Sequence, residues 1–359
     1  MNASPLPNLR ISNRNPSVAV IIVNWNRWKD TIKCFKTVCG SNYTDYRVVI
    51  CDNHSSDDSH ERLQSFLKAG FSPIEKKRFS TIDLFDFKSR IDSFQIYGPH
   101  CTFPWSQSIS PDIVLLRTKI NLGFAAGNNT AIIFAKRWFA PNYYWILNND
   151  TWVISDALPS MIDRMVNDRK AGICGSTLLS MDGKIQTLGG YRFLKWAGTG
   201  APIYAGCPRP SEVMPGRVEA QMDYVAGASM LVSRDFIETV GLMDESYFLY
   251  FEEIDWARRA RGRFKFLYAP NSIVYHREGG TIGSSGDGNR RSEKSFYWIC
   301  RSRVRFTARH HPEALPTVLA YSVMNALLWT FRTGKRSIFT HSMRGIADAF
   351  IKRCVLVAG

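Results

Sequence analysis

The chain lacks the signatures of several well-known protein classes. Its 8 cysteines are scattered without a CxxC pair, so free thiols in a reducing compartment are the simplest interpretation. No GxGxxG motif follows the first predicted strand, so a dinucleotide-dependent dehydrogenase finds no support. Residues 1–17 are polar and contain proline, with no visible signal peptide, and we expect them to form a flexible lead. Internal repeats and low-complexity tracts are also missing.

Charge is present in excess and unevenly placed. The 359 residues carry a formal net charge of +15, and residues 290–353 hold thirteen Lys and Arg against three acids. Such asymmetry indicates an anionic partner, either membrane phospholipid or nucleic acid. Residues 314–331 are uncharged but contain Pro, Ser, Asn and Thr. We expect a helix lying in the membrane interface, with a packed soluble helical hairpin and a true membrane span as open alternatives.

Hydrophobic runs and periodic segments alternate along most of the chain. The β-branched runs 18–26 and 46–53 predict buried strands, and 28–39 and 60–70 predict helices between and after them. This order is typical of an α/β layered fold with ligands at the carboxyl ends of its strands. We interpret residues 71–111 as an insertion and expect residues 183–217 to be irregular.

Acidic side chains follow several predicted strands. The segment "YYWILNND" ends in Asn148, Asn149 and Asp150, and "YRVVICDN" contains Asp52. Asp and Asn also form turns and helix caps, and turn chemistry is the favoured interpretation for Asp57 and Asp58. For Asp150 the two neighbouring amides favour a hard divalent cation with a diphosphate.

Seven motifs stand in one order over residues 18–280. They are "VNWN", "CDNHSSDDS", "NLGFAAGNN", "ILNND", "VAGASMLVSRDFIETVGLMDE", "YFLYFEEIDWARRARG" and "VYHREGG". Together they resemble glycosyltransferase family 2, the inverting GT-A enzymes, and most closely its rhamnosyltransferase-like branch. The resemblance implies a GT-A, Rossmann-like mixed sheet flanked by helices over 18–285, interrupted by the insertion 71–111. A basic, aromatic helical extension over 286–359 would associate with the membrane.

The resemblance also implies a metal site. Asp150 corresponds to the last acid of the family's DxD-type motif, which binds the ion that holds the donor's diphosphate. His276 corresponds to a further metal ligand, although a lone histidine after a strand is more often structural. Carboxylate and neutral imidazole suit Mg²⁺ or Mn²⁺.

The nucleotide-binding residues implied by the family lie at the ends of the first strands and in the glycine-containing loop. Asp52 matches the acid that hydrogen-bonds the base, and Trp25 stands where relatives place an aromatic residue against it, with a core tryptophan as the alternative. The full set is Asn24, Trp25, Asp52, Asn121, Gly123, Asn148 and Asn149. His54 replaces the small residue usual at its position, which leaves the local turn open.

The segment "FEEID" aligns with the family's catalytic acid. Glu253 is therefore the expected general base, which takes a proton from the acceptor hydroxyl during inverting transfer. Glu252, Asp255 and Gly227 are expected to contact the acceptor. The alternative for all three acids is a solvated helix start, which the helix dipole favours.

The implied function is metal-dependent transfer of a sugar, such as rhamnose from a dTDP- or UDP-linked donor, to a lipid-linked or polysaccharide acceptor in envelope glycan synthesis. We expect it at the cytoplasmic face of the cell membrane. A nucleotidyltransferase is one alternative, but "VNWNRWKDT" lacks the glycine-rich triphosphate loop. The other is a nucleic-acid-binding protein, suggested by arginines interleaved with aromatics in the tail. We do not expect nucleic acid as a partner.

Overall fold

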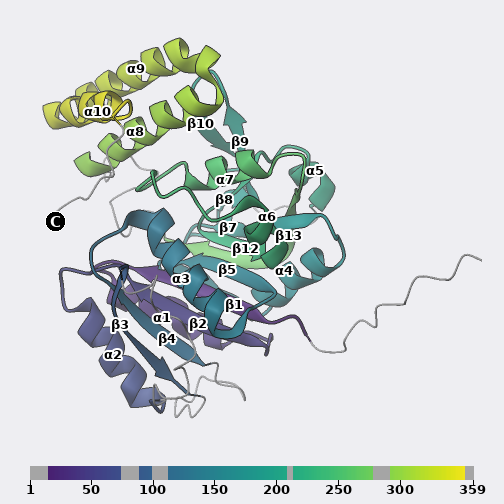
Figure 1. Ribbon diagram of the computed structural model, residues 1–359. Helices are drawn as coiled ribbons and strands as arrows, with labels where there is room; N and C mark the ends of the chain where they lie inside the picture. Colours follow the sequence, from purple (N-terminus) through teal and green to yellow (C-terminus); the bar gives the residue numbers. More distant parts are fainter. Residues whose placement is uncertain (1–14, 74–88, 99–111, 208–212, 278–291, 352–359) are drawn as a thin grey trace, which may run out of the picture.

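A mixed β-sheet forms the centre of the protein. The computed structural model describes residues 15–73, 89–98, 112–207, 213–277 and 292–351. Within these, ten strands share one sheet in the order β3-β4-β2-β1-β5-β12-β7-β13-β6, with β8 paired to β7 (Figure 1). Their bounds are β1 Val18–Asn24, β2 Tyr46–Asp52, β3 Ile91–Tyr97, β4 Ile113–Thr118, β5 Tyr143–Asn148, β6 Thr151–Val153, β7 Ala171–Leu179, β8 Ile185–Leu188, β12 Ser229–Ser233 and β13 Lys265–His276.

Helices cover both faces of this sheet, because strands such as β1 carry apolar side chains on both faces. Val18, Val20 and Ile22 pack into the core on one face, while Ala19 and Ile21 belong to the core on the other. A strand buried on both faces reads as a continuous hydrophobic run. The first face is covered by α1 Trp28–Cys39, α2 Ser59–Gly70 and α4 Ala157–Val166, and the second by α3 Gly123–Phe139, α6 Arg234–Val240 and α7 Glu252–Ala260.

The predicted α/β class is confirmed, and its parallel part positions the candidate site. Strand β1 pairs in parallel with both β2 and β5, and β2 pairs in parallel with β4. The carboxyl ends of these strands therefore meet at one edge of the sheet, where ligands of open α/β sheets bind. Antiparallel pairs appear at β12 and at β3, which makes the whole sheet mixed.

Two regions contain more structure than the sequence indicated. The predicted insertion 71–111 contributes β3, which pairs antiparallel with β4 at the edge of the sheet; residues 74–88 and 99–111 of it lie outside the described residues. The predicted irregular stretch contributes β8 and two strands of a second, three-stranded sheet, built from β9 Gly190–Leu194, β10 Thr199–Pro202 and β11 Tyr224–Val225. A short helix α5 Pro215–Glu219 precedes β11.

The C-terminal extension is helical, as predicted. It consists of α8 Glu293–His310, a 3-10 turn η3 Pro312–Ala314, α9 Leu315–Thr333 and α10 Arg336–Asp348. Figure 1 shows these helices at the end of the molecule beside β9 and β10, away from α2 and β3. Phe306 of α8 packs edge-on against Phe193 of β9, with ring centroids 5.3 Å apart. The expected lead 1–17 is described only from residue 15 onward.

Candidate active site

A large cavity opens at the carboxyl ends of the parallel strands. Its volume is about 1380 Å³, and its wall combines the ends of β1, β2 and β5, the start of α3, the second sheet, the start of α7 and one side of α8. The wall includes three predicted site residues that lie far apart in the sequence, Asp150, Glu253 and His276. The fold therefore brings the expected metal ligands and the expected base into one compartment.

Asp150 and His276 meet through strand pairing. β6 begins one residue after Asp150, and its Thr151 pairs with His276 at the end of β13. The imidazole Nε2 lies 3.3 Å from Asp150 Oδ1. Gln186 donates from Nε2 to the His276 carbonyl at 2.7 Å. Its Oε1 lies 3.0 Å from His276 Nδ1 and is left to accept a hydrogen bond from that N–H.

This arrangement fits a cation ligand pair. A proton on Nδ1 leaves the Nε2 lone pair facing a carboxylate oxygen, and two such groups repel unless a cation or a proton lies between them. Gln186 plays the part of the outer partner that orients a ligating histidine. Among the described residues no group of three or more His, Cys, Asp or Glu side chains has metal-site geometry. Asp150 and His276 could therefore provide two protein ligands to a cation, and a bound diphosphate would supply others.

The two amides before Asp150 have different surroundings. Asn149 is buried and donates from Nδ2 to Thr31 Oγ1 at 3.0 Å, which ties the strand end to α1. Asn148 remains half-buried, and its backbone N–H donates to Ala228 O. Both amides form part of the cavity wall.

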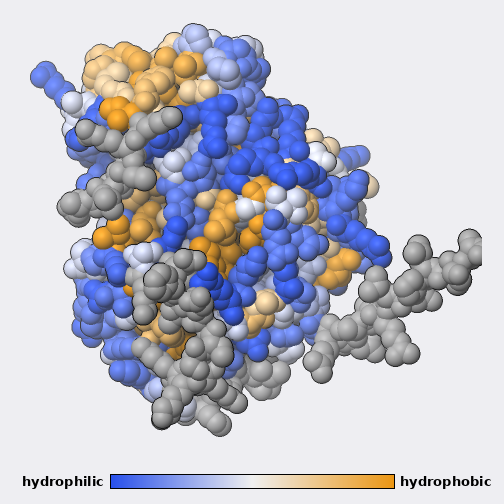
Figure 2. Space-filling view, viewed as in Figure 1, coloured by the Kyte–Doolittle hydropathy of each residue, from blue (hydrophilic) through white to orange (hydrophobic). Residues whose placement is uncertain are grey.

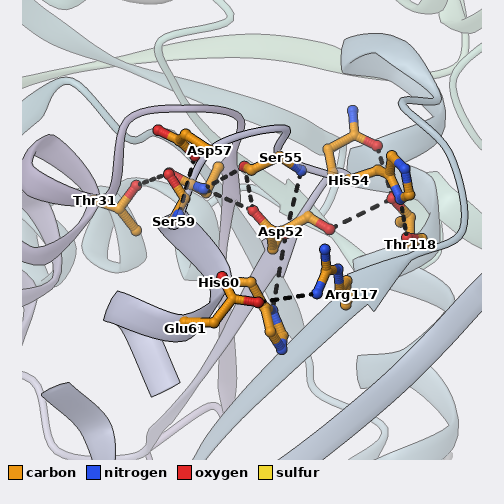
Figure 3. A network of polar contacts seen from close by, with 12 residues as sticks. Thr31, Asp52, His54, Ser55, Asp57, Ser59, His60, Glu61, Arg117 and Thr118 are labelled. Carbon is orange, nitrogen blue, oxygen red and sulfur yellow. Dashed lines mark hydrogen bonds and ion pairs between the residues drawn. The ribbon is translucent and has the colours of Figure 1, made fainter. Parts of the chain in front are cut away.

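Asp52 and Asn24 lie behind the wall and not in it. Asp52 is completely buried, and its Oδ1 accepts hydrogen bonds from Asn24 Nδ2 and from Ser55 Oγ (Figure 3). Asp52 is enclosed because the turn that follows it, in which His54 adopts a positive φ of 57°, brings Ser55 back onto the carboxylate. The expected hydrogen bond to a base stays a prediction, because Asp52 would first have to exchange one of these partners.

Asn53 takes the position on the cavity that the sequence favoured for Asp52. Its side chain accepts from Leu122 N–H and donates to Asn121 Oδ1 and Gly123 O, which joins the end of β2 to the start of α3. Trp25, Asn121 and Gly123 also line the cavity, and their contact with a nucleotide stays a prediction. Asn53 stands in the motif "CDNHSSDDS", but the sequence assigned it no role, because its place at the cavity depends on this contact between distant segments.

Gly123 is required by close packing. Its φ is +80°, and a Cβ atom there would lie 2.3 Å from the carbonyl oxygen of Phe248. The next residue, Phe124, donates its N–H to that same oxygen at 2.8 Å. The glycine therefore lets the start of α3 approach the loop that leads into α7, so that both border the cavity.

Glu252 and Glu253 open helix α7 after a strained turn. Tyr250 and Phe251 both have positive φ, 66° and 73°, which is uncommon for non-glycine residues and is found most often at functional sites. The Glu253 carboxyl faces Gly227, where a Cβ would lie 1.9 Å from Glu253 Oε1. Gly227 thus makes room for the glutamate; it also borders the cavity, and its expected contact with the acceptor stays a prediction.

Burial changes the acidity of both glutamates. Removal from water raises the pKa of Glu253 to about 7. Glu252 is 2% exposed, and burial together with the charge of Glu253 holds its pKa well above the usual range. Within the described part of the chain, Glu252 Oε2 has no hydrogen-bond partner, although the residue borders the cavity.

Asp255 is not among the residues that line the cavity, and its expected contact with an acceptor stays a prediction. It is completely buried; Oδ2 accepts from Arg259 Nε at 2.8 Å and Oδ1 from His310 Nε2 at 2.7 Å. His310 is the last residue of α8, so this hydrogen bond fastens α8 to α7.

Helix α8 forms one wall of the cavity, which the sequence did not predict. Trp298 stacks on Phe248 with ring centroids 4.3 Å apart, and Ser292, Lys294, Ile299 and Arg303 also border the cavity. The run of arginines and aromatics was interpreted as a surface for an anionic partner, yet Arg301 and Arg303 are almost completely buried. The helical period of "SFYWICRSRVRF" was the available signal that one face of it is packed.

Comparison with known proteins agrees with this architecture. The family model described as Glycosyl transferase family 2 matches residues 19–81, which run from β1 past α2. No curated protein sequence matches the chain. The family pattern therefore rests on this N-terminal segment.

Solved glycosyltransferase structures share the GT-A-like fold. GalNAc-T7 with UDP, GalNAc and Mn²⁺ has a TM-score of 0.51 and 16% identity over 93% of this chain and 57% of that one. TarS 1-349 of S. aureus in complex with UDP-GlcNAc has a TM-score of 0.51 and 11% identity, over 93% and 80%. The mannosyltransferase PcManGT from Pyrobaculum calidifontis, with GDP-Man and Mn²⁺, reaches 0.49 at 13% identity, over 94% and 86%. At such identities the likeness establishes the fold alone.

Proposed function

We propose that this chain, with a glycosyltransferase family 2 segment at its N-terminus and a GT-A-like fold throughout, transfers a sugar from a nucleotide donor to an acceptor hydroxyl with inversion at the anomeric carbon. The observation that carries the proposal is the meeting of Asp150, His276 and Glu253 in one cavity. A nucleotide-sugar transferase needs these two functions, diphosphate binding and proton removal, at neighbouring positions.

Asp150 and His276 would hold the metal ion, Mg²⁺ or Mn²⁺. The donor set supports this assignment, because carboxylate oxygen and neutral imidazole suit both ions and Gln186 keeps the imidazole in the ligating tautomer. When bound, the ion would neutralise charge on the departing nucleoside diphosphate. Two structural relatives were solved with Mn²⁺, and we transfer that dependence to this chain as part of the proposal.

Glu253 would act as the general base. A carboxyl whose pKa lies at about 7 is ionised often enough at neutral pH to accept a proton and basic enough to take one from a hydroxyl in the transition state. Gly227 on one side and the start of α7 on the other keep the carboxyl directed at the cavity. Glu252, buried beside it with one oxygen facing no partner in the described structure and with its pKa raised, would donate a hydrogen bond from its protonated carboxyl to a second group of the acceptor.

The donor would be a UDP- or dTDP-linked sugar, with dTDP-rhamnose as the candidate that the sequence motifs favour. The acceptor would be lipid-linked or a growing polysaccharide of the cell envelope, met at the cytoplasmic face of the membrane. The aromatic wall supplied by Trp298, Phe248 and the stacked pair Tyr191–Tyr224 supports a ring-bearing acceptor, since sugar rings pack on aromatic faces.

A donor screen tests the proposal. The full chain is incubated with UDP-, dTDP- and GDP-sugars in Mg²⁺, in Mn²⁺ and in EDTA, and release of nucleoside diphosphate is measured. We expect metal-dependent turnover of at least one donor, with Glu253→Gln lowering turnover by about 10²–10⁴-fold while donor binding persists. Turnover of Glu253→Gln at the wild-type rate would remove Glu253 from its role. Equal turnover in EDTA would show that the reaction does not require a metal ion.

A further inference from the structure

Helix α9 presents an apolar stripe to solvent. Met324, Leu327, Leu328 and Phe331 follow the spacing i, i+3, i+4, i+7, which places them on one helical face, and Phe331 is 82% exposed. Figure 2 shows a hydrophobic patch at the upper end of the molecule, where Figure 1 places α9 and α10. A contiguous exposed apolar patch on a protein surface usually marks an interaction site.

The opposite face of α9 is packed against the rest of the protein. Val318, Ser322 and Ala326 are buried there, and Ser322 Oγ accepts a hydrogen bond from Arg303 of α8 at 3.3 Å. Residues 312–333 are long and apolar enough to cross a membrane, with only 22% of the most apolar window buried. If α9 crossed a bilayer, the hydrogen bond between Ser322 and Arg303, a residue of the cavity wall, would be broken. The helix is therefore held flat on the protein with its apolar stripe outward.

Three cations follow the stripe. Arg332, Lys335 and Arg336 are exposed at the end of α9 and the start of α10, and none of them forms an ion pair with an acid in the described part of the chain. Arg332 lies over the ring of Trp329, with 5.3 Å between the guanidinium and the ring centroid. An apolar stripe beside unpaired cations and an aromatic residue has the composition of an interfacial helix on anionic lipid.

We propose that the α9 face formed by Met324, Leu327, Leu328 and Phe331, with Arg332, Lys335 and Arg336 beside it, docks in the plane of an anionic bilayer. The apolar side chains enter the boundary between headgroups and acyl chains, while the cations contact the phosphates. Because α9 rests on α8, docking fixes the cavity wall at a defined position relative to the lipid surface. Docking itself does not require the transfer reaction, so the two proposals can fail separately.

Vesicle flotation of the full chain tests the docking face. Vesicles of phosphatidylcholine alone are compared with vesicles containing about one third phosphatidylglycerol. We expect wild-type protein to float with the anionic vesicles. Replacing all three cations with glutamine should weaken binding on the order of 100-fold, since each contributes about fivefold. Leu327→Ser together with Phe331→Ser should weaken it by at least about tenfold and should do so even in high salt.

Matched controls keep the result interpretable. Met181→Ser alters a methionine in a turn elsewhere that is 56% exposed, close to the 52% of Met324. Met181→Ser should float as well as wild type, whereas Met324→Ser should float less. Thermal unfolding by circular dichroism verifies that each variant is folded. Failure of wild-type protein to bind anionic vesicles, or equal binding by the α9 variants, would overturn the proposal. So would a dimer in solution that the serine variants dissolve without lipid, because the stripe would then cover a second copy.

Discussion

Gly227 lies against the Glu253 carboxyl so closely that a single methyl group should disable the site. A Cβ at this position would lie 1.9 Å from Glu253 Oε1, whereas ordinary contact begins near 3.4 Å. In Gly227→Ala the carboxylate must therefore retreat by about 1.5 Å. A misplacement of about 1 Å at a reacting group can cost about 100-fold in rate. We expect kcat to fall by roughly that factor.

The backbone itself should accept alanine. Gly227 is not among the residues with positive φ, so the substitution causes no backbone strain and leaves the metal and nucleotide contacts in place. Donor binding measured by calorimetry should stay within about twofold, and the loss should appear in turnover. Gly216→Ala is the matched control, because a Cβ there meets nothing within 4 Å, and it should retain wild-type turnover.

A double mutant decides whether the methyl acts through Glu253. In the Glu253→Gln background, Gly227→Ala should cost much less than it does alone, because both changes remove the same function. Full turnover of Gly227→Ala in a folded protein, or losses that simply multiply in the double mutant, would refute the reasoning that the glycine exists to seat the carboxyl.

Three further predictions follow from the same contacts. Gln186→Leu should weaken Mn²⁺ binding about 10–100-fold in a metal titration, because His276 loses the partner that sets its tautomer; unchanged affinity would contradict the assigned ligand pair. Turnover should rise as the pH rises through a pKa of about 7. The free energy of unfolding should fall as the pH rises from the ordinary pKa of a glutamate to about 7, because in this range the folded state holds a proton on Glu253 that the unfolded state has released. Glu253→Gln should reduce this slope in a series of thermal melts, and the part that comes from Glu252 should remain. Asp255→Asn should destabilise the fold by about 1–3 kcal/mol, because the partly buried side chains of Arg259 and His310 lose the carboxylate that accepts their hydrogen bonds. A melting temperature equal to wild type would contradict that role.

Much of the fold was predictable from hydrophobic patterning. The runs that became β1, β2 and β7 are apolar at almost every position, because both faces of each strand are covered by helices, and such runs are legible without tertiary information. The predicted α/β class is confirmed on this basis. By contrast, β3 and the second sheet were missed, because short edge strands have weak periodicity and depend on the partner that pairs with them.

The sequence by itself determined which side chains carry usable chemistry. Asp150, His276 and Glu253 stand in motifs whose order indicated a glycosyltransferase, and the chain places all three in one cavity. Their roles rest on types of atoms, a carboxylate oxygen, an imidazole nitrogen and a basic carboxyl, which the residue names already specify.

Only the tertiary structure decided which of the other candidates border the cavity. Asp52 is enclosed by Ser55 and Asn24, Asp255 is hydrogen-bonded to Arg259 and His310, and α8 forms a wall of the cavity in addition to its place in the C-terminal extension. None of these outcomes is local. A charged side chain is either exposed to a ligand or paired inside the protein, depending on which residues lie close to it in space. Those residues become neighbours only after the chain has folded.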